Sequence, residues 1–322
     1  FKQKTAYEIR LSLVGSEMCI RDRDGALPVL VPVRPGEALP PEAGVAGFAG
    51  MAEKLLDLPG VPRRLWLGLG PQPRQLAWEQ AGVFAALQLK AVPHLVVEAR
   101  ALAAVEAAWL CAGLALGAWR FDRYRGEAVP RMVRVTVRVA DPRAAEAAWA
   151  QVAPGVEGCL WARDLVSEPA NHLTTRRFAQ ELETLAEHGV HVDIWGRKRL
   201  TRAGFGALLA VGGGSATPPR LAVLRWRGSI VAPPVVFVGK GLVFDTGGIS
   251  IKPAKGMESM RADMAGAAAC AGAMLALAKR HSPAPAVAVL ALAENATGAG
   301  SYRPSDVLRT ASGRTVEVVD TD

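Results

Sequence analysis

Short apolar runs of strand length alternate with longer helical patterns along the whole chain. In the first part, strands are expected at residues 26–33 ("ALPVLVPV"), 63–70 ("RRLWLGLG") and 133–140 ("VRVTVRVA"). Helices are expected at 48–56, 76–92 and 99–119, where apolar residues recur at helical spacing. This alternation of strands and helices predicts an α/β domain.

The second part contains apolar runs that are nearly continuous instead of alternating. They lie at 221–228 ("LAVLRWRG"), 234–241 ("PVVFVGKG") and 286–295 ("AVAVLALAEN"). Strands buried on both faces have this pattern. A long Ala-rich helix is expected between the last two runs, at 257–281, and "RTVEVVDTD" predicts a strand at 314–322.

These elements predict an α/β protein of two domains. An N-terminal α/β domain covers 24–140, a partly helical linker covers 141–155, and a second domain covers 156–322 with a mostly buried mixed sheet flanked by helices. A cap signal at Thr174 or Thr175 predicts the start of an amphipathic helix in this second domain. Residues 1–23 hold two of the nine lysines and two of the six isoleucines, unlike the rest, and are interpreted as a non-native or disordered tail.

The amino-acid composition of the chain limits which classes of binding partner are expected. The net charge of +8 would suit an anionic partner, but the basic residues are dispersed, so nucleic-acid binding is permitted and only weakly supported. The four cysteines form no CxxC pair, which favours a reducing cytoplasm. The apolar segment Ala107–Trp119 is too short to span a bilayer, so no membrane partner is expected.

Lysines are scarce in this chain and unevenly placed. There are 9 lysines against 29 arginines, and Lys240, Lys252 and Lys255 fall within sixteen residues. An arginine cannot readily lose its proton, whereas a buried lysine can, and it then offers a lone pair. The alternative is chance placement on the surface, and for Lys255 a solvated position is the preferred interpretation.

Charged residues follow the predicted buried strands. Lys240 and Asp245 follow "VVFV", Glu294 follows "AVAVLALA", and Asp322 follows "VEVV", while Asp263 lies on the helix beside them. Sites in open α/β sheets form at the carboxyl ends of the strands, and converging carboxylates repel one another unless cations lie between them. The pattern therefore predicts a site for divalent metal ions, with Lys240 as a neutral nitrogen ligand and a tight turn at Gly247 and Gly248. The alternative is a set of surface ion pairs.

The motifs in this region resemble the leucyl (cytosol) aminopeptidase family. The resemblance rests on "VGKGLVFDTGGISIKP", "MESMRADMAGAAA", "ENATGAGSYRPSDVL" and "SGRTVEVVDTD". Earlier segments, "SEPANHLTTRRFA" and "GFGALLAVGGGSATPPRLAVL", are similar to the start of that family's catalytic domain, and "LGAWRFDRYRG" is similar to the end of its N-terminal domain. The resemblance runs in order from about Leu27 to Asp322.

The resemblance implies a role for each matching residue. Lys240, Asp245, Asp263 and Asp322 fall on metal-ligand positions, with Asp245 bridging two divalent ions, Mn or Zn. Lys252 falls on the catalytic lysine, which contacts the scissile carbonyl and the tetrahedral intermediate. Met260 falls on a position that lines the pocket for the first side chain of the substrate. For Met257 and Met264 the preferred interpretation is a core stripe at helical spacing.

The chain departs from the family pattern at its end. The family continues after the final aspartate with Ala-Glu-Gly-Arg, which supplies a bridging glutamate and an arginine that holds a bicarbonate. Both residues are expected just beyond Asp322 and are absent here, so the bicarbonate is expected only in a full-length chain. The usual asparagine two residues earlier is Asp320. The 322-residue chain is therefore expected to be inactive and poorly folded by itself.

The resemblance implies a cytoplasmic metal-dependent aminopeptidase that releases N-terminal residues such as leucine from peptides. A full-length chain is expected to form a homohexamer. The alternatives are a nucleic-acid-binding protein of the same fold and a non-catalytic structural protein.

Overall fold

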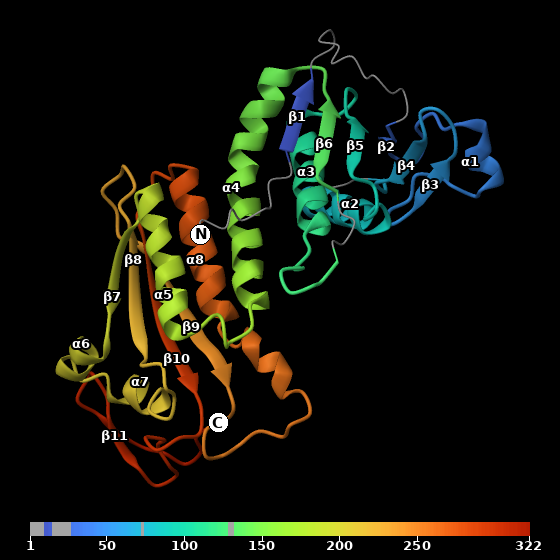
Figure 1. Ribbon diagram of the computed structural model, residues 1–322. Helices are drawn as coiled ribbons and strands as arrows, with labels where there is room; N and C mark the ends of the chain where they lie inside the picture. The colour runs from blue at the N-terminus through green and yellow to red at the C-terminus, as the bar shows by residue number, and fades with distance from the viewer. Residues whose placement is uncertain (1–9, 15–26, 72–73, 128–131) are drawn as a thin grey trace. The chain divides into compact units, whose positions relative to one another are not determined.

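The computed structural model describes residues 10–14, 27–71, 74–127 and 132–322, and for 10–14 it describes the backbone alone. The described residues form two compact units, 1–156 and 157–322 (Figure 1). Each unit has its own sheet and its own core.

The first unit is built on a six-stranded sheet in the order β1-β6-β5-β2-β4-β3. All neighbours are parallel except β3, which runs antiparallel to β4. The strands are β1 (Arg10–Val14), β2 (Val29–Val33), β3 (Leu55–Leu58), β4 (Arg64–Gly68), β5 (His94–Glu98) and β6 (Arg134–Arg138). The helices are α1 (Pro41–Val45), α2 (Gln75–Gln88) and α3 (Ala104–Ala118).

Two expectations for this unit are corrected. Residues 48–56, expected as a helix, form a loop followed by β3, and Gly50 in that loop adopts a φ of +72°, which ends any helical path. Within 1–23, interpreted as a non-native or disordered tail, residues 10–14 form β1 and pair with β6, so this part is not disordered and its backbone groups extend the sheet ladder. The other residues of that tail lie outside the described residues.

The segment expected as a linker is helical. α4 runs from Pro142 to Ser167 and passes through Pro154 without ending. Pro154 and Val156 are both buried, so apolar burial favours the helix across the proline, although proline removes a backbone donor.

The second unit has a four-stranded mixed sheet in the order β7-β8-β10-β9. Only β9 and β10 are parallel neighbours; the other pairs are antiparallel. The strands are β7 (His191–Trp195), β8 (Arg220–Trp226), β9 (Val235–Asp245) and β10 (Ala286–Asn295), and a small hairpin joins β11 (Val307–Arg309) to β12 (Thr315–Glu317). The helices are α5 (Thr175–Glu183), η1 (Thr184–His188), α6 (Arg197–Arg202), α7 (Gly206–Val211), η2 (Met257–Ala262) and α8 (Ala265–Lys279). Thr174 caps α5 by accepting a hydrogen bond from the Arg177 N–H.

Helices cover both faces of the sheet at β8 and β10, as the continuous apolar runs predict (Figure 1). The run at 234–241 departs from this expectation, because Val235, Val236 and Val238 of the edge strand β9 are exposed. On β10, Ala288 and Leu290 face the core with α5, α8 and the end of α4. Val287 and Val289 lie on the opposite face, with side chains of α6 and α7. Burial on both faces holds the strands in one register and leaves their ends as the place for polar groups.

One stretch, Met257–Lys279, is long and apolar enough to cross a membrane by length and hydropathy. Its main part, α8, packs in the core, where Ala271 and Met274 are fully buried. The apolar composition of this stretch is therefore that of a core helix.

We predict that Gly113→Ala destabilises the first unit. A Cβ at this position in α3 would lie 2.0 Å from the carbonyl oxygen of Glu79 in α2, so the two helices would have to separate. We expect a loss of about 1–3 kcal/mol in the free energy of unfolding, measured by urea denaturation. The matched control is Gly44→Ala in α1, where a Cβ meets nothing within 4 Å, and which should keep or raise stability. Equal unfolding free energies for the two variants would contradict the close packing of α2 and α3.

Candidate active site

The site lies where two parallel strands of the second unit end side by side. β9 ends at Asp245 and β10 at Asn295, and these two residues are direct partners across the ladder. The register shifts between Ala293 and Asn295, and this irregularity brings the two polar side chains level with each other.

A glycine turn follows β9 and folds back over the strand end. Gly247 and Gly248 have φ values of +85° and +69°, a region that L side chains rarely adopt. A Cβ on Gly247 would lie 2.4 Å from the Ser250 carbonyl oxygen. The glycines therefore allow the chain to turn tightly and to carry Lys252 back toward Asp245.

Asp245 is a buried carboxylate, 4% exposed. Its Oδ1 accepts hydrogen bonds of 2.9 Å from the Gly247 N–H and of 2.9 Å from Nδ2 of Asn295. Its Oδ2 lies 3.8 Å from Nζ of Lys252. One oxygen is thus held by neutral N–H donors, and the other faces positive charge.

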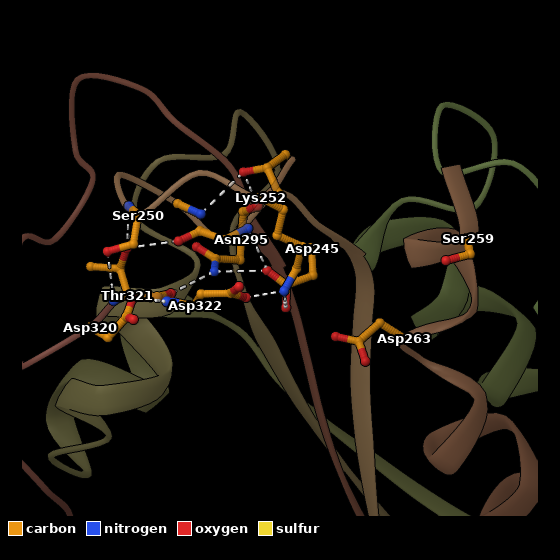
Figure 2. Close-up of polar contacts among 12 residues, drawn as sticks. Asp245, Ser250, Lys252, Ser259, Asp263, Asn295, Asp320, Thr321 and Asp322 are labelled. Atoms are coloured by element: carbon orange, nitrogen blue, oxygen red, sulfur yellow. Dashed lines mark hydrogen bonds and ion pairs between the residues drawn. The ribbon is translucent and has the colours of Figure 1, made fainter. Parts of the chain in front are cut away.

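Lys252 joins two of the expected metal ligands. Its ammonium group forms an ion pair with Asp322 in addition to the contact with Asp245 (Figure 2). The pKa of Lys252 is raised, chiefly by the bond to Asp322 and further by the negative charge of Asp245. Lys252 therefore stays protonated at neutral pH.

Lys240 and Asp263 form a separate pair. Nζ of Lys240 lies 2.9 Å from Oδ2 of Asp263, which immediately follows η2. That oxygen is buried and has no aligned hydrogen-bond partner among the described residues. Burial is the main cause that raises the pKa of Asp263, while Lys240 lowers it and the charge of Asp245 raises it further.

The last three residues reach the site without belonging to the main sheet. The strand expected at 314–322 is limited to β12, which pairs only with β11 among the described strands. The segment 320–322 is instead held by Thr321, which is 1% exposed. Its Oγ1 donates to the Gly247 carbonyl oxygen at 2.7 Å and accepts from the Ser250 N–H at 2.8 Å.

Sequence reasoning missed the residues that hold the charged groups in place. Asn295 donates from Nδ2 to the Thr321 carbonyl oxygen at 2.9 Å, and the hydroxyl of Tyr302 donates to the same oxygen at 2.7 Å. An available signal was the position of Asn295 at the end of an apolar run, equivalent to that of Asp245. The role of Thr321 had no such signal, because it depends on a contact with a turn 71 residues away.

The remaining candidates are also placed. Met260 lies in η2 and is half-buried, as is Met257, whereas Met264 is fully buried in the core, which confirms the core interpretation for Met264. Glu294 accepts hydrogen bonds from the hydroxyls of Ser215 and Thr217. Lys255 is exposed.

The donor types suit a divalent cation. Asp245 and Asp263 are largely shielded carboxylates, the charge of one raises the pKa of the other, and one buried oxygen of Asp263 lacks a hydrogen-bond partner among the described residues. A cation between such groups would relieve their repulsion. Within the described part of the chain, no three His, Cys, Asp or Glu side chains gather closely enough to hold an ion by themselves.

Comparison with known proteins identifies relatives over most of the chain. The family described as "Cytosol aminopeptidase family, catalytic domain" matches residues 160–322. A "Probable cytosol aminopeptidase" of Brucella anthropi is 38% identical over 300 residues, which are 87% of this chain and 60% of the relative. One from Agrobacterium fabrum is 40% identical over 306 residues, which are 89% of this chain and 62% of the relative. The chain thus spans about three fifths of the length of these relatives.

Solved structures share the fold. "Bottromycin maturation enzyme BotP in complex with Mn" aligns with a TM-score of 0.82 and 31% identity, over 92% of this chain and 66% of that one. A tomato leucine aminopeptidase mutant aligns with a TM-score of 0.82 over 99% of this chain and 69% of that one, and at 22% identity it supports the fold alone.

We predict that Thr321→Val destabilises the second unit. Valine keeps the shape of threonine, but it leaves the Ser250 N–H and the Gly247 carbonyl oxygen without their partner. We expect a loss of about 1–3 kcal/mol in the free energy of unfolding, measured by urea denaturation. The control is Thr297→Val, which removes a single bond, to the Gly248 carbonyl oxygen, from a more open position. A Thr321→Val variant as stable as the control would show that Thr321 does not hold the turn.

Proposed function

The chain belongs to the cytosol aminopeptidase family, and from this premise we propose that it carries the catalytic site of an aminopeptidase that uses two divalent ions, Mn or Zn, to release N-terminal residues such as leucine from peptides. The observation that carries the proposal is the meeting of Asp245, Lys252 and Asp322 beside the ends of β9 and β10. Surface ion pairs would not need a buried carboxylate or two consecutive glycines at positive φ.

Four residues are proposed as metal ligands: Lys240, Asp245, Asp263 and Asp322. Support comes from the burial of Asp245 and from the buried Oδ2 of Asp263, whose partner among the described residues is the ammonium of Lys240, since buried carboxylates require compensating charge. Lys240 lies beside Asp263 and must release a proton before its nitrogen can act as a ligand. When bound, divalent ions would polarise the scissile carbonyl and lower the pKa of the attacking water.

Lys252 is proposed as the group that stabilises the oxyanion. Its raised pKa keeps the ammonium charged, and its contacts with Asp245 and Asp322 hold it beside the proposed ligands. A charged donor held in place before the reaction stabilises developing negative charge without further reorganisation. Met260, half-buried in η2 and three residues before Asp263, is proposed to line the pocket for the first side chain of the peptide.

The cellular setting follows from the same relatives. Their description as cytosol aminopeptidases supports a cytoplasmic protein that acts on peptides. The homohexamer and the bicarbonate stay predictions for the whole protein.

We predict that removal of metal abolishes the activity of the complete gene product. Treatment with EDTA should stop the release of leucine from a leucyl dipeptide, and added Mn²⁺ should restore it, because Asp245, Asp263 and Asp322 supply charge for the cation. The BotP structure contains Mn, which supports Mn²⁺ as the first ion to test. Leucine release that resists EDTA, or no release with any divalent ion, would overturn the proposal.

We predict that Lys252→Arg lowers kcat about 100-fold or more, while the Kd for Mn²⁺ stays nearly unchanged. Arginine keeps the positive charge, but its planar guanidinium cannot replace the compact ammonium group of lysine at the reacting oxygen. Steady-state kinetics and isothermal titration calorimetry measure the two quantities. The matched control is Lys255→Arg, the same substitution at an exposed lysine, which should leave both unchanged. An equal loss of turnover and of Mn²⁺ affinity would count against the assigned role.

A further inference from the structure

Asn295 is a buried amide that connects two segments of the site. It is 3% exposed, and both hydrogen bonds from Nδ2 are 2.9 Å long, one to Oδ1 of Asp245 and one to the Thr321 carbonyl oxygen. An amide nitrogen carries two hydrogens, so the donor capacity of this group is fully used. Its acceptors lie 50 residues before it and 26 residues after it in the chain.

The backbone of Asn295 is attached to the same site. Its carbonyl oxygen accepts two hydrogen bonds from Thr246, one from the N–H and one from the hydroxyl, both at 2.9 Å. The side chain of Asn295 therefore holds the Asp245 carboxylate (Figure 2), and its main chain holds the next residue, Thr246. Little freedom is left for the Asp245 carboxylate to rotate.

The chemistry of an amide suits this position. The hydrogen bonds from Asn295 and from the Gly247 N–H both end on Oδ1 of Asp245, so Oδ2 is the oxygen left facing Lys252. A neutral donor orients the carboxylate without neutralising it, whereas a carboxylate at position 295 would repel it and an aliphatic side chain would release it. Partners that hydrogen-bond to a ligand in this way set its orientation and its affinity for a cation.

The hydrogen bond from Asn295 to the Thr321 carbonyl oxygen restricts the position of Asp322. The Thr321 carbonyl oxygen precedes the Asp322 N–H in the chain, so anchoring this carbonyl limits where the Asp322 side chain can go. Tyr302 anchors the same oxygen but contacts neither Asp245 nor Asp322 through a hydrogen bond given by the structure. Asn295 thus differs from Tyr302 because its amide bonds both to the Asp245 carboxylate and to the backbone that carries Asp322.

We propose that Asn295 is a positioning residue that sets the spacing between the Asp245 and Asp322 carboxylates and thereby the affinity of the site for divalent cations. This inference rests on the proposed function, because it concerns two of the proposed ligands. Asn295 itself binds no ion and touches no substrate in this role.

The first test is the affinity of the complete gene product for Mn²⁺. We expect Asn295→Leu, which keeps most of the volume and removes both donors, to weaken the Kd for Mn²⁺ about ten- to a hundredfold. Tyr302→Phe should have a smaller effect, since it removes only the bond to the Thr321 carbonyl. The matched control is Thr175→Val, which removes the hydrogen bond from the buried Thr175 side chain to the Pro218 carbonyl oxygen without touching Asp245 or Asp322. It should lower stability and leave the Kd for Mn²⁺ unchanged.

The second test needs no metal. In the metal-free protein, hydrogen–deuterium exchange should become faster in Asn295→Leu both at 245–252 and at 318–322, whereas Tyr302→Phe should affect 318–322 alone. If Asn295→Leu does not fold, Asn295→Ala replaces it, and the same exchange pattern is expected because alanine also has no side-chain donor.

The outcomes separate this inference from the proposed function. If wild-type protein binds no Mn²⁺ and releases no leucine, the proposed function fails, and the exchange pattern alone decides whether Asn295 couples the two segments. If wild-type protein binds Mn²⁺ but a folded Asn295 variant binds it equally well, the inference is overturned and the proposed function stands. Faster exchange at only one of the two segments would also overturn it.

Discussion

The burial of one acidic side chain, Asp245, is the constraint on which the site depends. A carboxylate at 4% exposure loses most of its hydration, and this costs several kcal/mol unless hydrogen bonds and opposite charge replace the water. The replacement comes from three directions: the Gly247 N–H, the Asn295 amide and the Lys252 ammonium. Each of these groups reaches Asp245 only because the chain turns at Gly247 and Gly248, and because β9 and β10 end level with each other.

The core of the second unit makes this arrangement possible. Side chains of β8 and β10 alternate between two apolar layers, one with α5 and α8 and one with α6 and α7. A slip by one residue would exchange the side chains of the two layers and disrupt the close packing of both. The register that places Asp245 opposite Asn295 is therefore maintained by apolar packing along the rest of the strands. Polar groups gather at the strand ends because neither apolar layer can accommodate them.

Much of this fold could be predicted from sequence, and the misses have physical reasons. The continuous apolar runs at 221–228 and 286–295 correctly predicted strands buried on both faces, whereas at 234–241 the prediction was wrong, because Val235, Val236 and Val238 of the edge strand β9 are exposed. The site expected from the charged residues after these runs stays a prediction. The prediction of a helix at 48–56 was wrong because the apolar spacing suits a helix, whereas glycines at positive φ oppose one. The partly helical linker expected at 141–155 lies within the longer helix α4, which continues through Pro154 because the burial of Pro154 and Val156 outweighs the missing backbone donor. Asn295 and Thr321 were missed because their roles arise from a register shift and from a long-range contact, neither of which leaves a periodic signal.

Asp320 illustrates how the local geometry absorbs a departure from the family pattern. The resemblance leads one to expect asparagine at this position, and the added charge had no predictable effect. Its Oδ1 accepts a hydrogen bond of 3.0 Å from the Asp322 N–H, and this bond is the main cause that lowers the pKa of Asp320. An asparagine carbonyl oxygen can accept the same bond, so the turn that presents Asp322 is compatible with either residue. What aspartate adds is negative charge near Tyr302, whose pKa is raised first by burial and then by Asp245, Asp320 and Asp322. The substitution therefore keeps the backbone of the site and makes its surroundings more favourable to cations.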